Sequence, residues 1–227
     1  VERGSMDDEI GDTGQTRIEL AQAAAIKLLD TLSASGDLGK IMVVWFNDNA
    51  DHNTEGGQVW TSVADAKAYI NSLSPTNDST NYDAAIEEVM DNWGDGPSSA
   101  DQTIVYMLSD GQPTGNGSIG NSARTTWETF IANQGVVKVY GVAVGHDITE
   151  LGALQPVALP NGDPNNPFTI DNENDLVSTT PGQLFGNVLT DGATDDSFGA
   201  DGGRILSILI DGVTYTWDGE GEITSDV

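Results

Sequence analysis

The chain of 227 residues contains no cysteine and only two histidines, His52 and His146. The absence of cysteine excludes disulfide bonds, thiolate nucleophiles, iron–sulfur clusters and cysteine-ligated zinc sites. The two histidines are far apart in the sequence, which gives zinc binding or general-base catalysis by histidine little support. Any ligand chemistry must therefore come mainly from oxygen-bearing side chains.

Basic residues are also scarce, with 8 lysines and arginines against 36 acidic residues and a net charge of −28. Without a basic footprint, we do not expect binding to nucleic acid phosphates or to anionic lipid headgroups. Self-repulsion of this size destabilises a compact chain unless counterions screen it, as high salt or millimolar Ca²⁺ outside the cell would do. The alternative interpretation is an acidic surface that serves only solubility.

Long apolar runs are missing as well. No run reaches the roughly 18 residues of a membrane span, and residues 1–6 lack the apolar region of a secretory signal peptide. We therefore expect no membrane insertion. Hydrophobic residues still make up 37% of the chain, which is enough for a core in one α/β domain of ordinary size plus a small appendage.

Helical and strand-like segments alternate along most of the sequence. Apolar residues at helical spacing predict helices over residues 16–32, 63–73, 81–93, 122–133, 148–154 and 181–189. Short apolar or β-branched runs predict strands over residues 41–46, 103–108, 136–144 and 168–170. This alternation predicts an α/β domain with a doubly wound, mostly parallel sheet and helices on both faces.

The alternation ends near residue 190. Residues 191–203 form a linker rich in Gly, Asp and Ala, and Asp211-Gly212 then separates two strand-like runs, which is a strong hairpin signal. We therefore expect an α/β domain over residues 1–190 and an appendage over 191–227 with a β-hairpin at 205–217. A lone hairpin is marginal in water, so it must pack on the domain, on residues beyond this sequence or on a partner.

Two stretches, residues 79–83 and 108–111, offer only oxygen ligands beside apolar sequence. Asp110 directly follows a predicted parallel strand, at the edge where open α/β sheets bind ligands. Converging oxygen donors there suit Mg²⁺, Ca²⁺ or Mn²⁺. Each residue also has a plain structural interpretation: Asp110 as a turn residue, and Thr80 as a helix N-cap with Asp83 in a capping box.

These stretches resemble the metal-ion-dependent adhesion site of the von Willebrand factor type A domain, and the resemblance covers residues 5–189. In that family a second loop carries threonine in Thr-Asn-Tyr-Asp-Ala-Ala-like sequence, and a third carries aspartate in Ser-Asp-Gly. Residues 80–85 and 109–111 match both. The resemblance implies a Rossmann-like fold with a metal ion bound by Thr80 directly and by Asp110 directly or through water. The ion would be Mg²⁺ or Ca²⁺, with Mn²⁺ as a further candidate. A carboxylate of a protein or peptide partner would bind to this ion.

The first loop departs from the family's Asp-x-Ser-x-Ser pattern. Gly4-Ser5-Met6 matches, which makes Ser5 a metal ligand, but Val1 stands in place of the aspartate and Arg3 in place of the first serine. Glu2 replaces the missing acid only if a one-residue gap is allowed. The apolar first strand of the family is also absent from this sequence. Two explanations compete: an expression-vector remnant or altered terminus, and a genuinely degenerate site.

The C-terminal part resembles segments that flank type A domains in large bacterial repeats-in-toxin (RTX) adhesins, which type I systems secrete and calcium rigidifies. The resemblance rests on residues 199–203 and the hairpin, and it implies that the hairpin is half of a split β-domain. Two further acidic clusters are calcium candidates, although neither has EF-hand spacing and solvated loop charge is the favoured interpretation. The candidate ligands are Asp171 and Asp175 in the first cluster, and Asp195, Asp196 and Asp201 in the second.

The sequence thus predicts a non-enzymatic, extracellular adhesion module on a bacterial surface. It would bind a protein or peptide on a host or neighbouring cell through a divalent cation, and it would sit beside other adhesin domains. The first alternative is a structural spacer with a degenerate metal site. The second is a Mg²⁺-dependent phosphotransferase with Asp110 as nucleophile, although its motif requires a second aspartate where Gln112 stands.

Overall fold

A computed structural model gives the fold of the chain. It describes residues 5–34, 38–76, 78–97, 102–110, 112–114, 117–145 and 151–179, and three short strands between residues 207 and 225. Two compact units are present, residues 1–183 and residues 184–227.

The first unit alternates helices and strands. Its described residues form four α-helices: α1 (Arg17–Ala34), α2 (Val63–Ser72), α3 (Tyr82–Asn92) and α4 (Asn121–Asn133). Its strands are β1 (Val44–Phe46), β2 (Ala50–His52), β3 (Thr103–Ser109), β4 (Val136–Val144) and β5 (Phe168–Ile170). The described part of this unit also contains three short 3₁₀ helices: η1 (Ser5–Asp7), η2 (Leu151–Ala153) and η3 (Asp175–Thr179).

The strands of the first unit form two sheets. β3, β4 and β5 are parallel, in that order, with Ser109 opposite Ala143 and Val144 opposite Ile170. β1 and β2 form a separate antiparallel pair. Parallel strands require crossover connections, and here α4 connects β3 to β4 as in other α/β folds.

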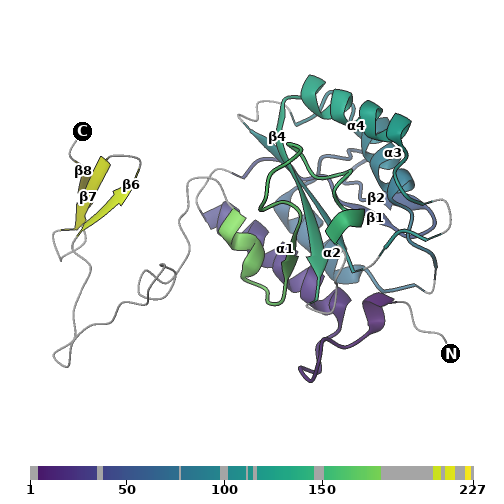
Figure 1. The fold of residues 1–227 in the computed structure, drawn as a ribbon, viewed down its shortest axis with the longest axis horizontal. Helices are drawn as coiled ribbons and strands as arrows, with labels where there is room; N and C mark the ends of the chain where they lie inside the picture. Colours follow the sequence, from purple (N-terminus) through teal and green to yellow (C-terminus); the bar gives the residue numbers. More distant parts are fainter. Residues whose placement is uncertain are drawn as a thin grey trace. The chain divides into compact units, whose positions relative to one another are not determined.

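Helices cover both faces of the parallel sheet, with α3 and α4 on one side and α1 on the other (Figure 1). Side chains that alternate along β4 divide between the two faces. Val139 and Ala143 pack with α3 and α4, whereas Val142 and Val144 pack with α1 and β5. Trp93 and Trp127 are 3% and 1% exposed in the first of these cores, as expected of large aromatic residues that contribute to packing.

The structure confirms the predicted doubly wound α/β fold, and the observed helices and strands lie close to their predicted positions. One difference is the run from Ile41 to Phe46, in which only Val44–Phe46 forms a strand and every residue is half-buried. The predicted helix at 181–189, the linker at 191–203 and the domain boundary at 190 lie outside the described residues, as do residues 148–150 of the helix predicted at 148–154. The described part of that last segment contains η2.

The second unit contains an antiparallel pair, β6 (Ser207–Ile210) and β7 (Val213–Trp217), with Ile210 opposite Val213. This pair is the predicted hairpin. A third strand that the sequence did not predict, β8 (Ile223–Ser225), pairs antiparallel with β7. A third strand helps to stabilise the unit, because an isolated two-stranded hairpin is only marginally stable.

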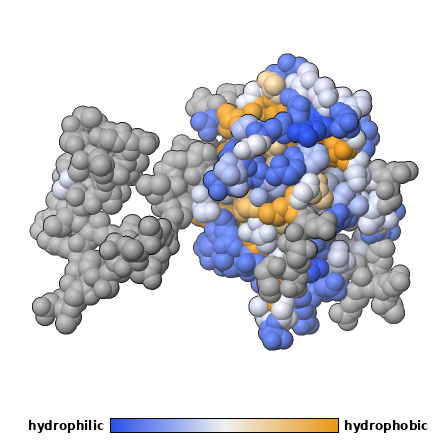
Figure 2. Space-filling model, viewed as in Figure 1, coloured by the Kyte–Doolittle hydropathy of each residue, from blue (hydrophilic) through white to orange (hydrophobic). Residues whose placement is uncertain are grey.

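Hydrophilic residues cover much of the first unit on the face that Figure 2 shows, with smaller apolar patches between them. Among the described residues, no helix combines the length and the apolar character that crossing a membrane requires.

A buried asparagine bonds to the backbone of β4 between the Val139–Leu159 bridge and the stretch that pairs with β5. β5 pairs only with Val142 to Val144 of β4. Just before that stretch, the Asn166 side chain donates to the Val139 carbonyl at 2.8 Å and accepts from the Gly141 amide at 3.0 Å. Asn166 is 2% exposed, so water cannot easily take its place.

We expect Asn166→Ala to destabilise the fold by about 1–3 kcal/mol, because it removes the acceptor of the buried Gly141 amide. The Val139 carbonyl loses one of its two donors but keeps the Leu159 amide at 2.9 Å. The exposed Asn165→Ala is the matched control and should change stability by less than about 0.5 kcal/mol. Urea unfolding of both variants measures the difference. Equal stability of the two would show that the Asn166 bonds are dispensable.

Candidate functional site

The candidate site lies just past the carboxyl end of β3. β3 is a run of apolar and β-branched residues that ends at Ser109, and Asp110 follows it directly. Asp110 is 6% exposed, which is unusual for an aspartate because a buried charge needs a partner. The position matches the edge at which open parallel sheets bind ligands.

The N-terminal segment brings Ser5 to this aspartate. A side-chain hydrogen bond joins the Ser5 hydroxyl, as donor, to the Asp110 carboxylate. Ser5 belongs to η1, and its carbonyl accepts from Arg17 Nη1 at 3.2 Å. The first and third predicted loops therefore meet in space, although 105 positions separate their two residues in the sequence.

Arg17, at the start of α1, brings a positive charge that no sequence motif indicated. Its Nη1 lies 3.8 Å from Asp110 Oδ2 and 3.6 Å from Asp8 Oδ2, and its side chain is only 13% exposed. Gly145 permits this close approach: its φ is +94°, and a Cβ there would lie 3.3 Å from Arg17 Nε. The guanidinium partly offsets the negative charge of Asp110.

Thr80 lies on the loop that leads into α3. The N-cap of α3 is Asn81, whose side-chain oxygen accepts from the Ala84 amide at 3.1 Å. The alternative in which Thr80 caps the helix is therefore wrong. The capping requirement of α3 is met by Asn81, which leaves the Thr80 hydroxyl available for another role.

Backbone contacts hold the Thr80 loop against the loop after β3. The Thr80 amide donates to Thr114 Oγ1 at 3.1 Å, and the Thr114 amide donates to the Thr80 carbonyl at 2.9 Å. Gly117 packs so closely against this loop that a Cβ at Gly117 would lie 2.5 Å from the backbone carbonyl oxygen of Thr80. Only glycine fits such an approach of two backbones.

The start of α3 is also connected to the end of β3. Tyr82 is fully buried, and its hydroxyl forms a side-chain hydrogen bond with Ser109. Burial raises the pKa of Tyr82 to about 12, so it stays a neutral phenol at ordinary pH. Thr80 therefore lies two residues before a side chain that contacts the neighbour of Asp110.

One oxygen of the Asp110 carboxylate has no hydrogen-bond donor among the described residues. Its Oδ2 is buried and accepts no hydrogen bond from any residue in the described part of the chain. Burial raises the pKa of this carboxyl, against the opposing effects of the Ser5 hydrogen bond and the Arg17 charge. A buried carboxylate oxygen without a donor, beside a hydroxyl, is suited to an oxygen-preferring cation.

Of the other predicted calcium ligands, the structure describes Asp171 and Asp175. Asp175 Oδ2 accepts from the amides of Asp171 and Asn172, at 2.7 and 2.9 Å. The carboxylate of Asp175 thus stabilises the turn before η3, a common role for aspartate. Calcium binding there stays a prediction. Glu2 and the remaining three aspartates lie outside the described residues: Asp195, Asp196 and Asp201.

A second group of candidate metal ligands lies on β2 and α3. One ligand atom from each of Asp51, His52 and Glu88 lies within 4.8 Å of the other two. His52 Nδ1 is 2.6 Å from Glu88 Oε1, and the Asn92 side chain donates to the same oxygen at 3.0 Å. This group was not predicted from the sequence, because 36 residues separate His52 from Glu88 and neither belongs to a motif.

The raised pKa of Asp110 predicts a pH-dependent stability difference. The folded state holds the proton more tightly than the unfolded state, so ionised Asp110 destabilises the fold and stability falls as pH rises through the folded pKa. In chelator, Asp110→Asn should raise the melting temperature at pH 7 and leave it nearly unchanged at pH 3, where both states are protonated. The exposed Asp91→Asn on α3 is the control. A lower melting temperature of Asp110→Asn at pH 7 would show that ionised Asp110 stabilises the fold instead.

Comparison with known proteins agrees with the geometry. Residues 4–112 match a family model described as the von Willebrand factor type A domain. A search of curated proteins finds no match. Among solved structures, BatB, a conserved hypothetical protein from Bacteroides thetaiotaomicron, has 18% sequence identity and a TM-score of 0.53, over 75% of this chain and 86% of its own.

The mussel byssus provides a second similar structure, proximal thread matrix protein 1. One of its crystal forms has a TM-score of 0.54 and 18% identity over 71% of this chain. The present chain spans only 40% of that protein. Another form, with a TM-score of 0.52, has zinc in its metal-ion-dependent adhesion site. At this identity the likeness establishes the fold, which is the α/β fold of the von Willebrand factor type A domain.

Proposed function

We propose that this chain is a divalent-cation-dependent protein-binding module. Ser5, Thr80 and Asp110 would hold Mg²⁺ or Ca²⁺ at the carboxyl edge of the sheet. A carboxylate of a protein or peptide ligand would complete the coordination, as an oxygen ligand suits either ion. Domains with the von Willebrand factor type A fold are commonly metal-dependent protein-interaction modules, which fits this proposal.

The observation that carries the proposal is the contact between Ser5 and Asp110. Two oxygen-bearing residues from opposite ends of the matched region meet at the end of β3. The loop of Thr80 is attached beside them through Tyr82 and Ser109. A hydroxyl and a carboxylate brought together at a sheet edge form the kind of oxygen site that hard cations prefer.

The residues fit a cation in their chemistry, but Arg17 opposes one. Asp110 Oδ2 is buried and has no hydrogen-bond donor among the described residues, so a cation would supply what the fold does not. Arg17 lies 3.8 Å from the same oxygen, and like charges this close repel in a poorly solvated site. We therefore expect weak binding, with Arg17 displaced toward Asp8 when the ion binds.

We place the module outside the cell, on a bacterial adhesin. The net charge of −28 and the lack of cysteine support a calcium-rich environment and a fold without disulfides. Its partners would be a protein or peptide on another cell and flanking domains of the same adhesin. We assign it no catalytic role, because the deep burial of Asp110 makes it a poor phosphate-accepting nucleophile.

Isothermal titration of the chain with MgCl₂, CaCl₂ and MnCl₂ tests the metal site. We expect binding by the unmodified chain and a loss of about tenfold or more in Thr80→Ala and in Asp110→Asn, the scale seen when metal sites lose a contributing group. Asp110→Asn should weaken the binding of all three ions, since Asp110 is the only charged residue among Ser5, Thr80 and Asp110.

Matched controls keep this test specific. Thr125→Ala on α4 and Asp91→Asn on α3 make the same chemical changes at exposed positions and should leave the affinities unchanged. Zinc should also be titrated, because the group at His52 is a different site. If His52→Ala abolishes zinc binding and Asp110→Asn does not, the zinc is bound by Asp51, His52 and Glu88. Such a result would not support the proposed site at Asp110.

A structural spacer with a degenerate site is the second candidate, and Arg17 is the observation that favours it. Its guanidinium lies 3.8 Å from Asp110 Oδ2 and partly neutralises this carboxylate without any ion. The two candidates differ in the variant Arg17→Gln. If the spacer interpretation is right, neither the unmodified chain nor Arg17→Gln binds Mg²⁺ or Ca²⁺. If the adhesion module is right, both bind, and Arg17→Gln binds more tightly.

A further inference from the structure

A histidine and two carboxylates meet where β2 packs on α3. His52 Nδ1 and Glu88 Oε1 are 2.6 Å apart, and Asp51 Oδ1 lies 3.9 Å from the same nitrogen. One ligand atom from each of the three residues lies within 4.8 Å of the other two. The group therefore combines nitrogen and oxygen donors, whereas Ser5, Thr80 and Asp110 offer oxygen alone.

The distances within this group are close to those of a zinc centre. A tetrahedral zinc ion with bonds of about 2.0–2.2 Å holds its ligand atoms about 3.4 Å apart. The pair formed by His52 Nδ1 and Glu88 Oε1 is shorter than this, and the pair formed by His52 Nδ1 and Asp51 Oδ1 is longer. Each pair must therefore change by less than about 1 Å to hold the ion. The Asp51 side chain is 68% exposed, so little opposes its movement.

The charges of the group also favour a cation. Within the described ranges, Asp51 and Glu88 form ion pairs with His52 and with no lysine or arginine. When the imidazole is neutral, the three side chains together carry two negative charges. The Glu88 side chain is only 20% exposed, and shielding from water makes an unbalanced charge unfavourable. A divalent cation would balance the two carboxylates.

Neighbouring groups hold both carboxylates in place. One turn after Glu88, the Asn92 side chain donates to Glu88 Oε1 at 3.0 Å and to the Glu88 carbonyl at 3.1 Å. The backbone amide of His52 donates to Asp51 Oδ1 at 2.8 Å. Hydrogen bonds from outer residues orient the ligands of metal centres in the same way. The two carboxylates are thus oriented beside the imidazole before any ion binds.

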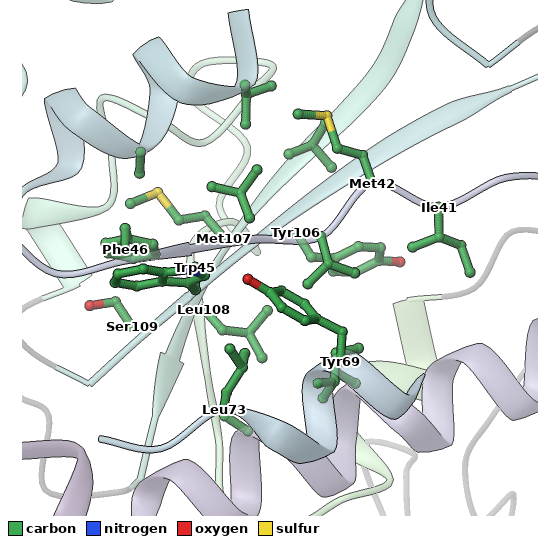
Figure 3. Close-up of a pocket in the computed structure, with 18 of the residues that line it drawn as sticks. Ile41, Met42, Trp45, Phe46, Tyr69, Leu73, Tyr106, Met107, Leu108 and Ser109 are labelled. Atoms are coloured by element: carbon green, nitrogen blue, oxygen red, sulfur yellow. The ribbon is translucent and has the colours of Figure 1, made fainter. Parts of the chain in front are cut away.

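The group provides three ligands and leaves a fourth position open. No further histidine, aspartate or glutamate joins it among the described residues. Tyr69 of α2 is the nearest additional candidate, since burial and then the charge of Asp51 raise its pKa. Its hydroxyl is instead hydrogen-bonded to Trp45, beside which it lies in the cavity that Figure 3 shows. The fourth position of a tetrahedral ion is therefore left to water or to a donor from a partner.

We propose that Asp51, His52 and Glu88 form a zinc site that ties β2 to α3. The ion binds His52 Nδ1 and one oxygen of each carboxylate, and the neutral imidazole then carries its proton on Nε2. Imidazole ligands favour Zn²⁺ over Mg²⁺ and Ca²⁺, and Mn²⁺ binds such sites more weakly than zinc does. This site is separate from the one proposed at Asp110 and does not depend on it.

Isothermal titration with ZnCl₂ tests the site in the Asp110→Asn chain, in which the other proposed site is disabled. We expect this chain to bind one zinc ion. In the same background, Glu88→Gln should weaken the affinity by about 100-fold, and Asn92→Ala, which removes an orienting hydrogen bond, by about tenfold. Glu87→Gln, at an exposed neighbouring position, is the matched control and should leave the affinity unchanged. Absence of zinc binding, or equal affinities in Glu88→Gln and Glu87→Gln, would overturn the proposal.

NMR of the imidazole nitrogens tests the site without changing any of its residues. The chain has two histidines, so His146→Gln assigns the signals of each. We expect ZnCl₂ to shift the Nδ1 signal of His52 and to leave its Nε2 protonated. A shift confined to His146, or unchanged signals of His52 in excess zinc, would overturn the proposal.

Thermal unfolding distinguishes a zinc site from a histidine–glutamate pair that only stabilises packing. An ion that binds the folded arrangement raises the melting temperature by mass action. At free zinc of about 100 times the dissociation constant, we expect a rise of about 5–10 °C in Asp110→Asn. Adding Glu88→Gln should reduce this rise to about 1–2 °C at the same zinc concentration. The same rise in both chains, or none in either, would contradict the zinc site.

Discussion

The candidate site depends on a buried carboxylate at the end of a parallel strand. Asp110 is held there because β3 must be apolar to pack between two helix layers, and the chain then leaves the sheet at its carboxyl edge. Burial makes the charge unfavourable, and the Ser5 hydroxyl and Arg17 only partly compensate for it. Asp110 Oδ2, which has no hydrogen-bond donor among the described residues, is the atom at which a cation or a guanidinium can bind.

Much of this could be predicted from the sequence. Val136–Val144 and the strand before Asp110 were predicted because their apolar residues are continuous, and α2 because its apolar spacing is regular. Asp110 was predicted from its position after a strand, and Ser5 from the resemblance. The N-cap of α3 was ambiguous in the sequence because Thr80 and Asn81 both have side chains that can cap a helix.

Arg17 could not be predicted, and the reason is physical. It stands in the first turn of an amphipathic helix, where an arginine normally extends into solvent. Its approach to Asp110 depends on tertiary contacts, namely the space that Gly145 leaves and the carbonyl of Ser5. The weak strand at residues 41–46 has a similar cause. Its residues predict a buried strand, but the burial depends on a neighbour that the described residues do not provide.

A cavity of about 1380 Å³ (Figure 3) lies beside the candidate site, since Ser5, Thr80 and Asp110 are among the residues that line it. The most direct measurement is paramagnetic broadening by Mn²⁺ in an NMR spectrum of the chain. If Ser5, Thr80 and Asp110 share one ion, substoichiometric Mn²⁺ broadens their amides before any others. Broadening confined to the Asp171–Asp175 loop or to the group at His52 would contradict a shared site at the end of β3.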